Sequence, residues 1–106
     1  MKCDAMDIHE VKNLIEQGNV NIVDVRDPQS YTEAHIKGAI LITQETIENF
    51  IRDADKEKPL ICYCYHGISS LNAKSFFEEN GFKTVNSMDG GFEEWQTVYP
   101  FVVGAD

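Results

Sequence analysis

Short runs of apolar residues, many of them β-branched, alternate with segments of helical periodicity along this chain of 106 residues. Apolar runs of roughly four to eight residues between turn residues are typical of buried strands. Four runs are predicted to be strands: residues 20–25, 39–42, 60–64 and 84–88. Strands that alternate with helices are joined by crossover connections and lie parallel. The predicted fold class is therefore α/β, with a mostly parallel central sheet covered by helices on both faces.

Five segments beside these runs carry apolar residues at helical spacing, and capping or breaking residues mark their ends. Asp7 with Glu10 resembles a capping box, and Pro28 suits the first turn of a helix. Gly18 and Gly38 are expected to break the helices that precede them. The predicted helices run, in chain order, between Asp7 and Gly18, Pro28 and Gly38, Thr43 (as N-cap) and Ala54, Ser69 or Ser70 and Gly81, and Gly91 and Pro100.

Length and charge narrow the class of protein. A chain of 106 residues suits one domain, predicted here over residues 1–106. The net charge of −9 repels phosphate backbones, so no nucleic-acid partner is expected. No run approaches the ~18 apolar residues of a membrane span, and residues 1–4 lead directly into polar sequence without an apolar signal core. We therefore expect a cytoplasmic protein with no membrane partner.

The chain has 3 cysteines, an odd number that does not resemble a disulfide framework. Cys62 and Cys64 alternate with Tyr63 on one predicted strand, and Cys3 has no assigned role. All three are predicted to be reduced, with Cys62 a buried structural thiol. A zinc site at Cys62, Cys64 and His66 is not expected, because alternate residues of one strand do not reproduce the usual ligand spacing.

The candidate site is the segment that follows the third predicted strand. In open α/β sheets, ligands bind beyond the carboxyl ends of the strands. The segment 64–70 reads Cys-Tyr-His-Gly-Ile-Ser-Ser, and residues 59–73 contain no Asp, Glu, Lys or Arg. A buried strand explains part of that gap but not the loop, since surface loops are normally polar or charged.

A cysteine that faces a helix amino terminus has a physical reason to be reactive. The N–H groups of the loop and of the first helical turn stabilise a thiolate and can lower its pKa from ~8.5 into the range of about 3.5–7.5. The same groups can hold an anionic substrate or adduct. From the residues alone, Cys64 is either such a nucleophile or a structural thiol. His66 either assists the thiolate or is an exposed loop residue, while His35 is expected to be structural.

Two further segments make the chain resemble the rhodanese domains. The amino-terminal signature of that family resembles Ile-Val-Asp-Val-Arg-Asp at 22–27, Tyr31, and His-Ile-Lys-Gly-Ala-Ile at 35–40. Its carboxyl-terminal signature resembles Asp-Gly-Gly-Phe-Glu-Glu-Trp at 89–95. The resemblance spans about residues 3–99, is nearest to the single-domain bacterial thiosulfate sulfurtransferases of the family, and places Cys64 where the family keeps its active-site cysteine.

The resemblance implies persulfide chemistry without a metal or an organic cofactor. Cys64 would take the outer sulfur of thiosulfate and pass it to cyanide or to a thiol acceptor, thioredoxin among them. The implied substrate-binding residues are Tyr65, His66, Gly67, Ile68, Ser69 and Ser70. Asp24 and Arg26 match positions interpreted as fold-supporting polar contacts, and Trp95 is interpreted as a core anchor.

The departures from the family pattern leave alternatives open. Ala34 replaces a frequent glycine, and the loop lacks the Lys or Arg that some thiosulfate-specific members place there. A persulfide carrier for a protein partner shares the chemistry and differs in the acceptor. A non-catalytic rhodanese-like binding module would commonly lack Cys64. A phosphatase-like enzyme would place Arg where Ser70 stands, since its guanidinium clamps the oxyanion.

Overall fold

The computed structural model describes residues 5–65 and 69–104, with the backbone alone for Ala5 and residues 69–71. Cys3 lies outside the described residues. Helices and strands alternate along the chain as the sequence predicts. In chain order they are β1 (Ala5–Met6), α1 (Ile8–Gln17), β2 (Asn21–Asp24), α2 (Pro28–Glu33), β3 (Ile40–Leu41), α3 (Ile47–Asp53), β4 (Leu60–Tyr63), α4 (Ser69–Glu79), β5 (Val85–Met88) and α5 (Gly91–Val98).

The strands form one parallel sheet in the order β1-β5-β4-β2-β3. β4 is the central strand: Cys62 lies opposite Val23 of β2 on one side and opposite Ser87 of β5 on the other. All four residues of β4 are buried, as expected for a strand with neighbours on both sides and helices on both faces. The predicted parallel sheet is confirmed.

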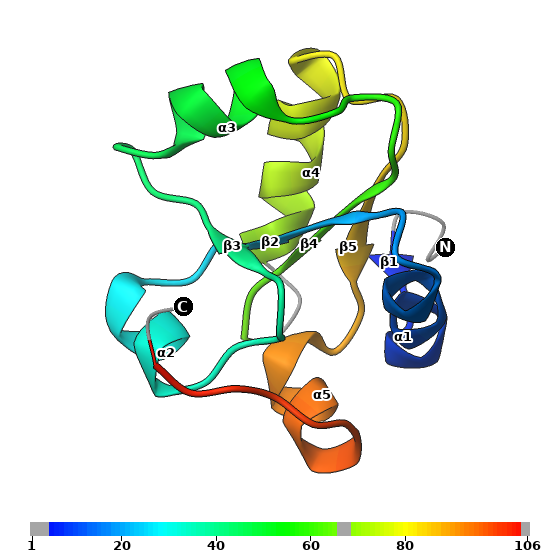
Figure 1. Ribbon diagram of the computed structural model, residues 1–106, viewed down its shortest axis with the longest axis vertical. Coiled ribbons are helices and arrows are strands. Elements are labelled where there is room, and N and C mark those ends of the chain that lie inside the picture. Colours follow the sequence, from blue (N-terminus) through cyan, green and yellow to red (C-terminus); the bar gives the residue numbers. More distant parts are fainter. Residues whose placement is uncertain (1–4, 66–68, 105–106) are drawn as a thin grey trace.

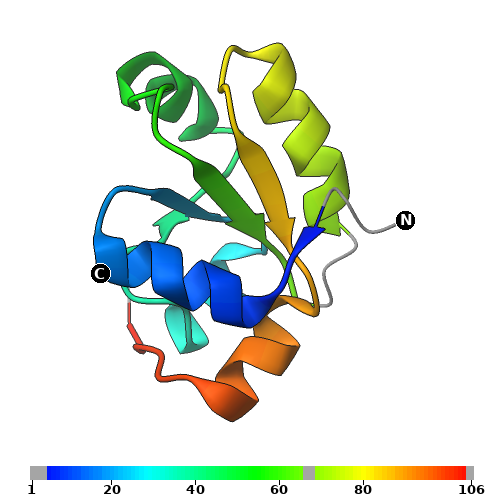
Figure 2. The ribbon, with the colours of Figure 1, turned by 90° about the vertical axis from the view of Figure 1, so that its right-hand side faces the viewer.

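Helices cover both faces of the sheet (Figures 1 and 2), which also confirms the predicted architecture. α1, α2 and α5 cover one face, where Trp95, Tyr63 and Phe92 belong to one buried cluster. α3 and α4 cover the other face, where Phe50 and Phe77 belong to a second cluster that also contains Cys62. Trp95 is the core anchor that the sequence indicates, and its Nε1–H donates to the Pro100 carbonyl oxygen at 3.0 Å.

Local signals place the ends of α1 correctly. The Asp7 side chain accepts the N–H groups of His9 and Glu10, and Gly18 ends the helix in the left-handed conformation at φ 82°. The residues that begin and end α1 lie at its own two ends, so its bounds do not depend on contacts with distant segments.

Three predicted elements differ from the structure. α2 ends at Glu33 rather than near Gly38, because His35 leaves the helix to pair with Val102 through both backbone hydrogen bonds. The third helix begins at Ile47, because the Thr43 hydroxyl caps a preceding turn instead of the helix. The strand predicted as buried over 39–42 is the two-residue edge strand β3. Ala39 and Ile42 beside it are buried as predicted, whereas Ile40 is 46% exposed.

The carboxyl-terminal segment packs on the domain. Besides the His35–Val102 pair, the Gly104 N–H donates to the Thr32 carbonyl oxygen at 2.7 Å. Residues 102–104 therefore hold α2 and the segment that follows it by backbone hydrogen bonds, and they lie beside that segment in Figure 1. Across the described ranges, no helix combines the length and the apolar character that a membrane span requires.

Candidate active site

Cys64 lies directly after β4, at the carboxyl end of the central strand. The loop that begins there leads to α4, which starts at Ser69 (Figure 1). Cys64 is 6% exposed, and its thiol is reduced. The strand-to-helix position predicted for the candidate nucleophile is confirmed, and it is the edge of a parallel sheet at which ligands bind.

The structure describes part of the predicted site. Tyr65 is exposed, and its hydroxyl accepts a hydrogen bond from the Gln96 side chain at 3.3 Å. The sequence predicts Ser69 or Ser70 as the N-cap of α4, and in the structure both serines lie within its first turn. His66, Gly67 and Ile68 lie outside the described residues, and their substrate-binding roles stay predictions.

Cys62 differs from Cys64 in burial and in acidity. Its side chain is fully buried, and its thiol donates to the Asn86 carbonyl oxygen at 3.6 Å. Burial penalises the thiolate and raises the pKa of Cys62 to about 12. Cys62 is thus protonated at neutral pH, which agrees with its structural interpretation, so of the two described thiols Cys64 is the candidate nucleophile.

The raised pKa of Cys62 predicts a loss of stability in alkali. The folded thiol titrates near 12 and the ordinary value is 9.0, so above pH 9 the unfolded chain releases its proton first. The folded state then binds more protons, and the free energy of unfolding falls as the pH rises from about 9 to about 12. Burial also raises the pKa of Tyr63, so this residue adds to the fall in the free energy of unfolding as the pH rises.

Urea denaturation between pH 8 and pH 11, with reductant present, measures this slope. Cys62→Ala should start from lower stability because it leaves a cavity. Its stability should nevertheless fall less steeply with pH than that of the wild type, the remainder coming from Tyr63. Equal slopes in the two proteins would contradict the assignment.

A buried ion pair lies at the end of β2, the neighbour of β4. The Arg26 guanidinium contacts both carboxylate oxygens of Asp24, at 2.7 Å for the shortest bond, and also donates to the Ala34 carbonyl oxygen at 2.6 Å. Its carbon Cζ lies 4.5 Å from the ring centroid of Phe92 on α5. Burial disfavours the charged form of Arg26 and lowers its pKa. The hydrogen bonds and negative charge of Asp24 have the larger combined effect, so the pKa of Arg26 is raised. The pair joins β2, the end of α2 and α5, which confirms its fold-supporting interpretation.

His35 is structural, as predicted. It is fully buried, its ring stacks on Tyr31 at a centroid distance of 3.8 Å, and its Nδ1–H donates to the Tyr31 carbonyl oxygen at 2.8 Å. These contacts hold the turn after α2 and leave His35 no direct part in the candidate chemistry.

The amino terminus of α5 contacts the Cys64 loop, which the sequence interpretation missed. The Phe92 N–H donates to the Cys64 carbonyl oxygen at 2.8 Å, and the Glu93 N–H donates to the Tyr65 carbonyl oxygen at 2.9 Å. These are N–H groups that a helix start leaves without intrahelical partners. The signal in the sequence is the glycine pair Gly90-Gly91, which marks the start of a helix and belongs to the carboxyl-terminal signature but does not by itself indicate a contact with Cys64.

A hollow of about 220 Å³ lies beside Tyr65. Phe92 and Gln96 of α5 line it together with Arg26 and Glu33. Of the described residues around it, Arg26 carries the one positive charge, and Asp24 already pairs with that charge. The hollow is therefore close to the candidate nucleophile in sequence and structure but offers an anion little net attraction.

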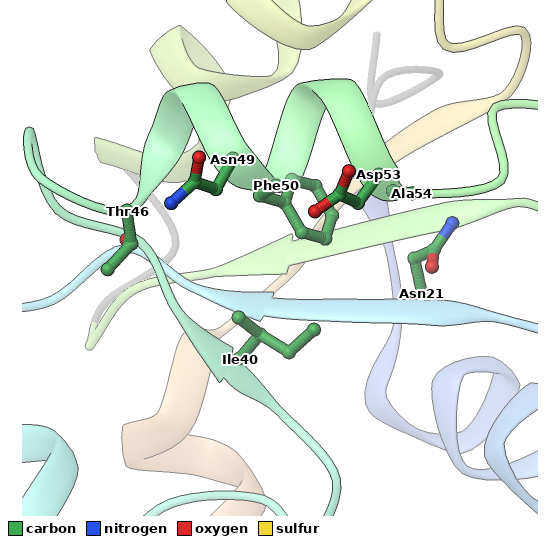
Figure 3. Close-up of a pocket in the computed structure, with 7 residues that line it drawn as sticks. All are labelled: Asn21, Ile40, Thr46, Asn49, Phe50, Asp53 and Ala54. Carbon is green, nitrogen blue, oxygen red and sulfur yellow. The ribbon is translucent and has the colours of Figure 1, made fainter.

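A larger groove of about 410 Å³ lies away from the Cys64 loop, between α3 and the edge strand β3 (Figure 3). Ile40 and Phe50 form its apolar part, and Asn21, Asn49 and Asp53 its polar part. None of the thiols or histidines described in the structure lines it. Within the described part of the chain, no three His, Cys, Asp or Glu side chains gather as a metal site would require.

Comparisons with known proteins agree with this architecture. The sequence profile of the rhodanese-like domain matches residues 7–97. The chain belongs to the rhodanese-like domain family. It is 46% identical over 91 residues to a protein of Pseudomonas aeruginosa named thiosulfate sulfurtransferase GlpE, covering 86% of this chain and 82% of that protein. It is 42% identical over 90 residues to the protein of the same name from Shewanella oneidensis, covering 85% and 89%.

Solved structures show the same fold. A rhodanese-like domain protein from Staphylococcus aureus superposes with a TM-score of 0.79 at 26% identity and covers 96% of this chain and 99% of its own. The BH2092 protein of Bacillus halodurans superposes with a TM-score of 0.78 at 32% identity, covering 96% and 81%.

Proposed function

We propose that this rhodanese domain is a thiosulfate sulfurtransferase that carries a sulfane sulfur on Cys64. The observation that carries the proposal is the position of Cys64, a nearly buried thiol at the carboxyl end of the central strand of the sheet. The curated relatives named thiosulfate sulfurtransferase, 42–47% identical over most of the chain, support the activity and the donor.

In the first step, the Cys64 thiolate attacks the outer sulfur of thiosulfate. The S–S bond of the donor breaks, its electron pair leaves with sulfite, and Cys64 becomes the persulfide Cys–S–S⁻. The total charge of −3 is the same before and after this step, so no external oxidant or reductant is required. The enzyme uses no metal or organic cofactor, because the nucleophile itself carries the transferred atom.

In the second step, an acceptor nucleophile attacks the outer sulfur of the persulfide. Cyanide yields thiocyanate, a thiolate yields a new persulfide, and both return the Cys64 thiolate. Each cycle begins with Cys64 as a free thiolate that is neither oxidised nor in a disulfide. A reducing compartment such as the cytoplasm therefore suits the reaction. The first product, sulfite, leaves before the acceptor reacts, so double-displacement kinetics are expected.

The loop after Cys64 stabilises both anions of the cycle. Residues 65–70 supply backbone N–H groups between β4 and the first turn of α4. Such groups form a preorganised positive environment for a thiolate or a persulfide without carrying a formal charge. In this proposal the segment from Tyr65 to Ser70 binds the substrate mainly through its backbone.

Among the described residues around the hollow, no positive charge is left unpaired, and this predicts that the KM for thiosulfate rises when the salt concentration falls. Thiosulfate carries two negative charges and approaches a chain of net charge −9, with Glu33 beside the hollow and Arg26 already paired with Asp24. Lowering the salt from about 0.5 M to about 0.02 M should raise the KM for thiosulfate roughly threefold, because repulsion is then less screened.

Steady-state kinetics at several KCl concentrations test this prediction. An aromatic thiosulfonate, which carries one negative charge, serves as the matched donor and should show the smaller change in KM. A KM for thiosulfate that falls at low salt would show that a local positive site dominates.

Thiocyanate formation from thiosulfate and cyanide tests the proposed reaction. Double-reciprocal plots at several cyanide concentrations should be parallel, and the rate should depend on Cys64. A folded protein that neither forms thiocyanate nor takes up sulfur would favour the non-catalytic binding module. Cys64-dependent hydrolysis of an aryl phosphate would favour the phosphatase-like alternative.

The acceptor distinguishes a small-molecule enzyme from a persulfide carrier. Tyr65 is 41% exposed beside the candidate nucleophile, so a protein partner can reach this rim of the site. Reduced thioredoxin should accept the sulfur as a dithiol, releasing sulfide and forming its own disulfide. A kcat/KM far higher with thioredoxin than with cyanide would assign the carrier role, and no sulfide release would remove thioredoxin as an acceptor.

A further inference from the structure

We propose that the amino terminus of α5 positions the Cys64 loop and that Gly91 is the residue that makes this contact possible. The inference deepens the proposed function and rests on it, since it names a positioning residue for the same thiol. It begins from the two hydrogen bonds by which Phe92 and Glu93 hold the carbonyl oxygens of Cys64 and Tyr65.

Gly91 leaves no room for a side chain. A Cβ atom there would lie 2.7 Å from the Cys64 carbonyl oxygen and 2.6 Å from the Tyr65 carbonyl carbon, and closer still to the Tyr65 carbonyl oxygen. All of these are backbone atoms of the loop, so no flexible side chain can move aside. The first residue of α5 thus packs directly on the backbone that carries the candidate nucleophile.

The two hydrogen bonds also decide which way the loop faces. In a trans peptide unit, the carbonyl oxygen and the N–H point in opposite directions. The Cys64 carbonyl oxygen points toward α5 because it accepts the Phe92 N–H. The N–H of Tyr65, in the same peptide unit, therefore points away from α5 and toward the opposite side of the loop. We infer that α5 holds the carbonyl groups of Cys64 and Tyr65 and so sets the direction of the Tyr65 N–H beside the Cys64 thiol.

The other glycines provide a matched comparison. Gly91 has a φ of 62°, and Gly18 has a φ of 82°, so alanine is strained at both positions. A Cβ atom at Gly18, however, would meet nothing within 4 Å. Gly91→Ala and Gly18→Ala should therefore share the backbone strain, while Gly91→Ala alone pushes on the Cys64 loop.

The pH dependence of Cys64 alkylation by iodoacetamide tests the proposal, with the labelled cysteine located by mass spectrometry. In Gly91→Ala, the apparent pKa of Cys64 should rise by about one unit toward ~8.5. Its kcat for sulfur transfer should fall at least tenfold. Gly18→Ala should lower the melting temperature but leave the alkylation pKa and kcat at their wild-type values. Equal effects of the two variants on the alkylation pKa would overturn the proposal.

A second pair of variants removes one hydrogen bond without adding a Cβ atom, in case Gly91→Ala fails to fold. Glu93 lies in the first turn of α5, and its N–H bonds to the Tyr65 carbonyl oxygen rather than within the helix, so proline there breaks no intrahelical hydrogen bond. Its ring carbon Cδ takes the place of the N–H hydrogen and therefore also displaces the Tyr65 carbonyl group. Glu93→Pro should raise the Cys64 pKa and lower kcat, and Glu93→Ala, which keeps the N–H, should have the smaller effect on both. An unchanged pKa and kcat in folded Glu93→Pro would contradict the positioning role.

The same experiment separates the two proposals. A wild-type protein that does not transfer sulfur would refute the proposed function, whereas the alkylation profiles still measure what α5 does to Cys64. Active wild-type protein with no difference between the glycine variants would refute the positioning role alone.

Discussion

Cys64→Ser is expected to reduce sulfur transfer from thiosulfate by at least about a thousandfold, since removing a covalent nucleophile eliminates the step that it performs. A serine hydroxyl is not ionised at neutral pH and does not form a persulfide. The substitution is nearly isosteric and lies just beyond a strand end, so the free energy of unfolding should change by less than about 1 kcal/mol. Thiocyanate formation and urea denaturation measure the two effects.

Cys62→Ser is the matched control, because Cys62 lies on β4, two residues before Cys64. A serine oxygen lies closer to Cβ than the sulfur does, so its hydroxyl must shift to reach the Asn86 carbonyl oxygen, which is 3.6 Å from the Cys62 sulfur. The cost in stability should be about 1–2 kcal/mol. Its sulfur transfer should remain close to the wild-type rate. An inactive but folded Cys62→Ser protein, or an active Cys64→Ser protein, would show that the nucleophile is assigned wrongly.

Asp24→Ala is expected to lower the free energy of unfolding by about 3–5 kcal/mol, because it leaves the Arg26 guanidinium buried without its partner. The Arg26 side chain is 7% exposed and that of Asp24 is 0% exposed, so little water replaces the lost carboxylate. Arg26 also bonds to the Ala34 carbonyl oxygen and lies over the Phe92 ring. Disturbing it should therefore loosen α2 and α5 together, which urea denaturation followed by Trp95 fluorescence would detect.

The exposed pair of Arg52 and Asp53 provides the control for Asp24→Ala. Both side chains are exposed, so Asp53→Ala should leave the denaturation midpoint at its wild-type value. The double variant Asp24→Ala with Arg26→Met should recover part of the loss, because it removes the unpaired charge. Equal destabilisation by Asp24→Ala and Asp53→Ala would refute the structural role of the buried pair.

The parts of the fold that the sequence predicts are those whose causes are local. Asp7 and Gly18 define α1 from within its own ends, and the apolar run before Cys64 indicates a buried strand wherever its neighbours lie. The position of Cys64 follows from the same local pattern, since a strand that leads into a helix at the edge of a parallel sheet places its last residue at the ligand-binding edge.

The features that the sequence did not predict depend on contacts between distant segments. β1 has two residues and exists because Ala5 and Met6 pair with β5, which no periodicity can indicate over so short a span. α2 ends early because Val102 pairs with His35. Gly91 indicated the start of a helix, but its contact with the Cys64 loop depends on the ends of β4 and β5 lying side by side.

The intact mass of the reduced protein after incubation with thiosulfate, before and after cyanide, tests the central claim most directly. The account predicts that the wild type gains one sulfur atom, that cyanide removes it, and that Cys62→Ser behaves in the same way. Cys64→Ser should gain none. A sulfur adduct that persists in Cys64→Ser, or a wild type that gains no sulfur while remaining folded and reduced, would contradict the assignment of Cys64 as the persulfide carrier.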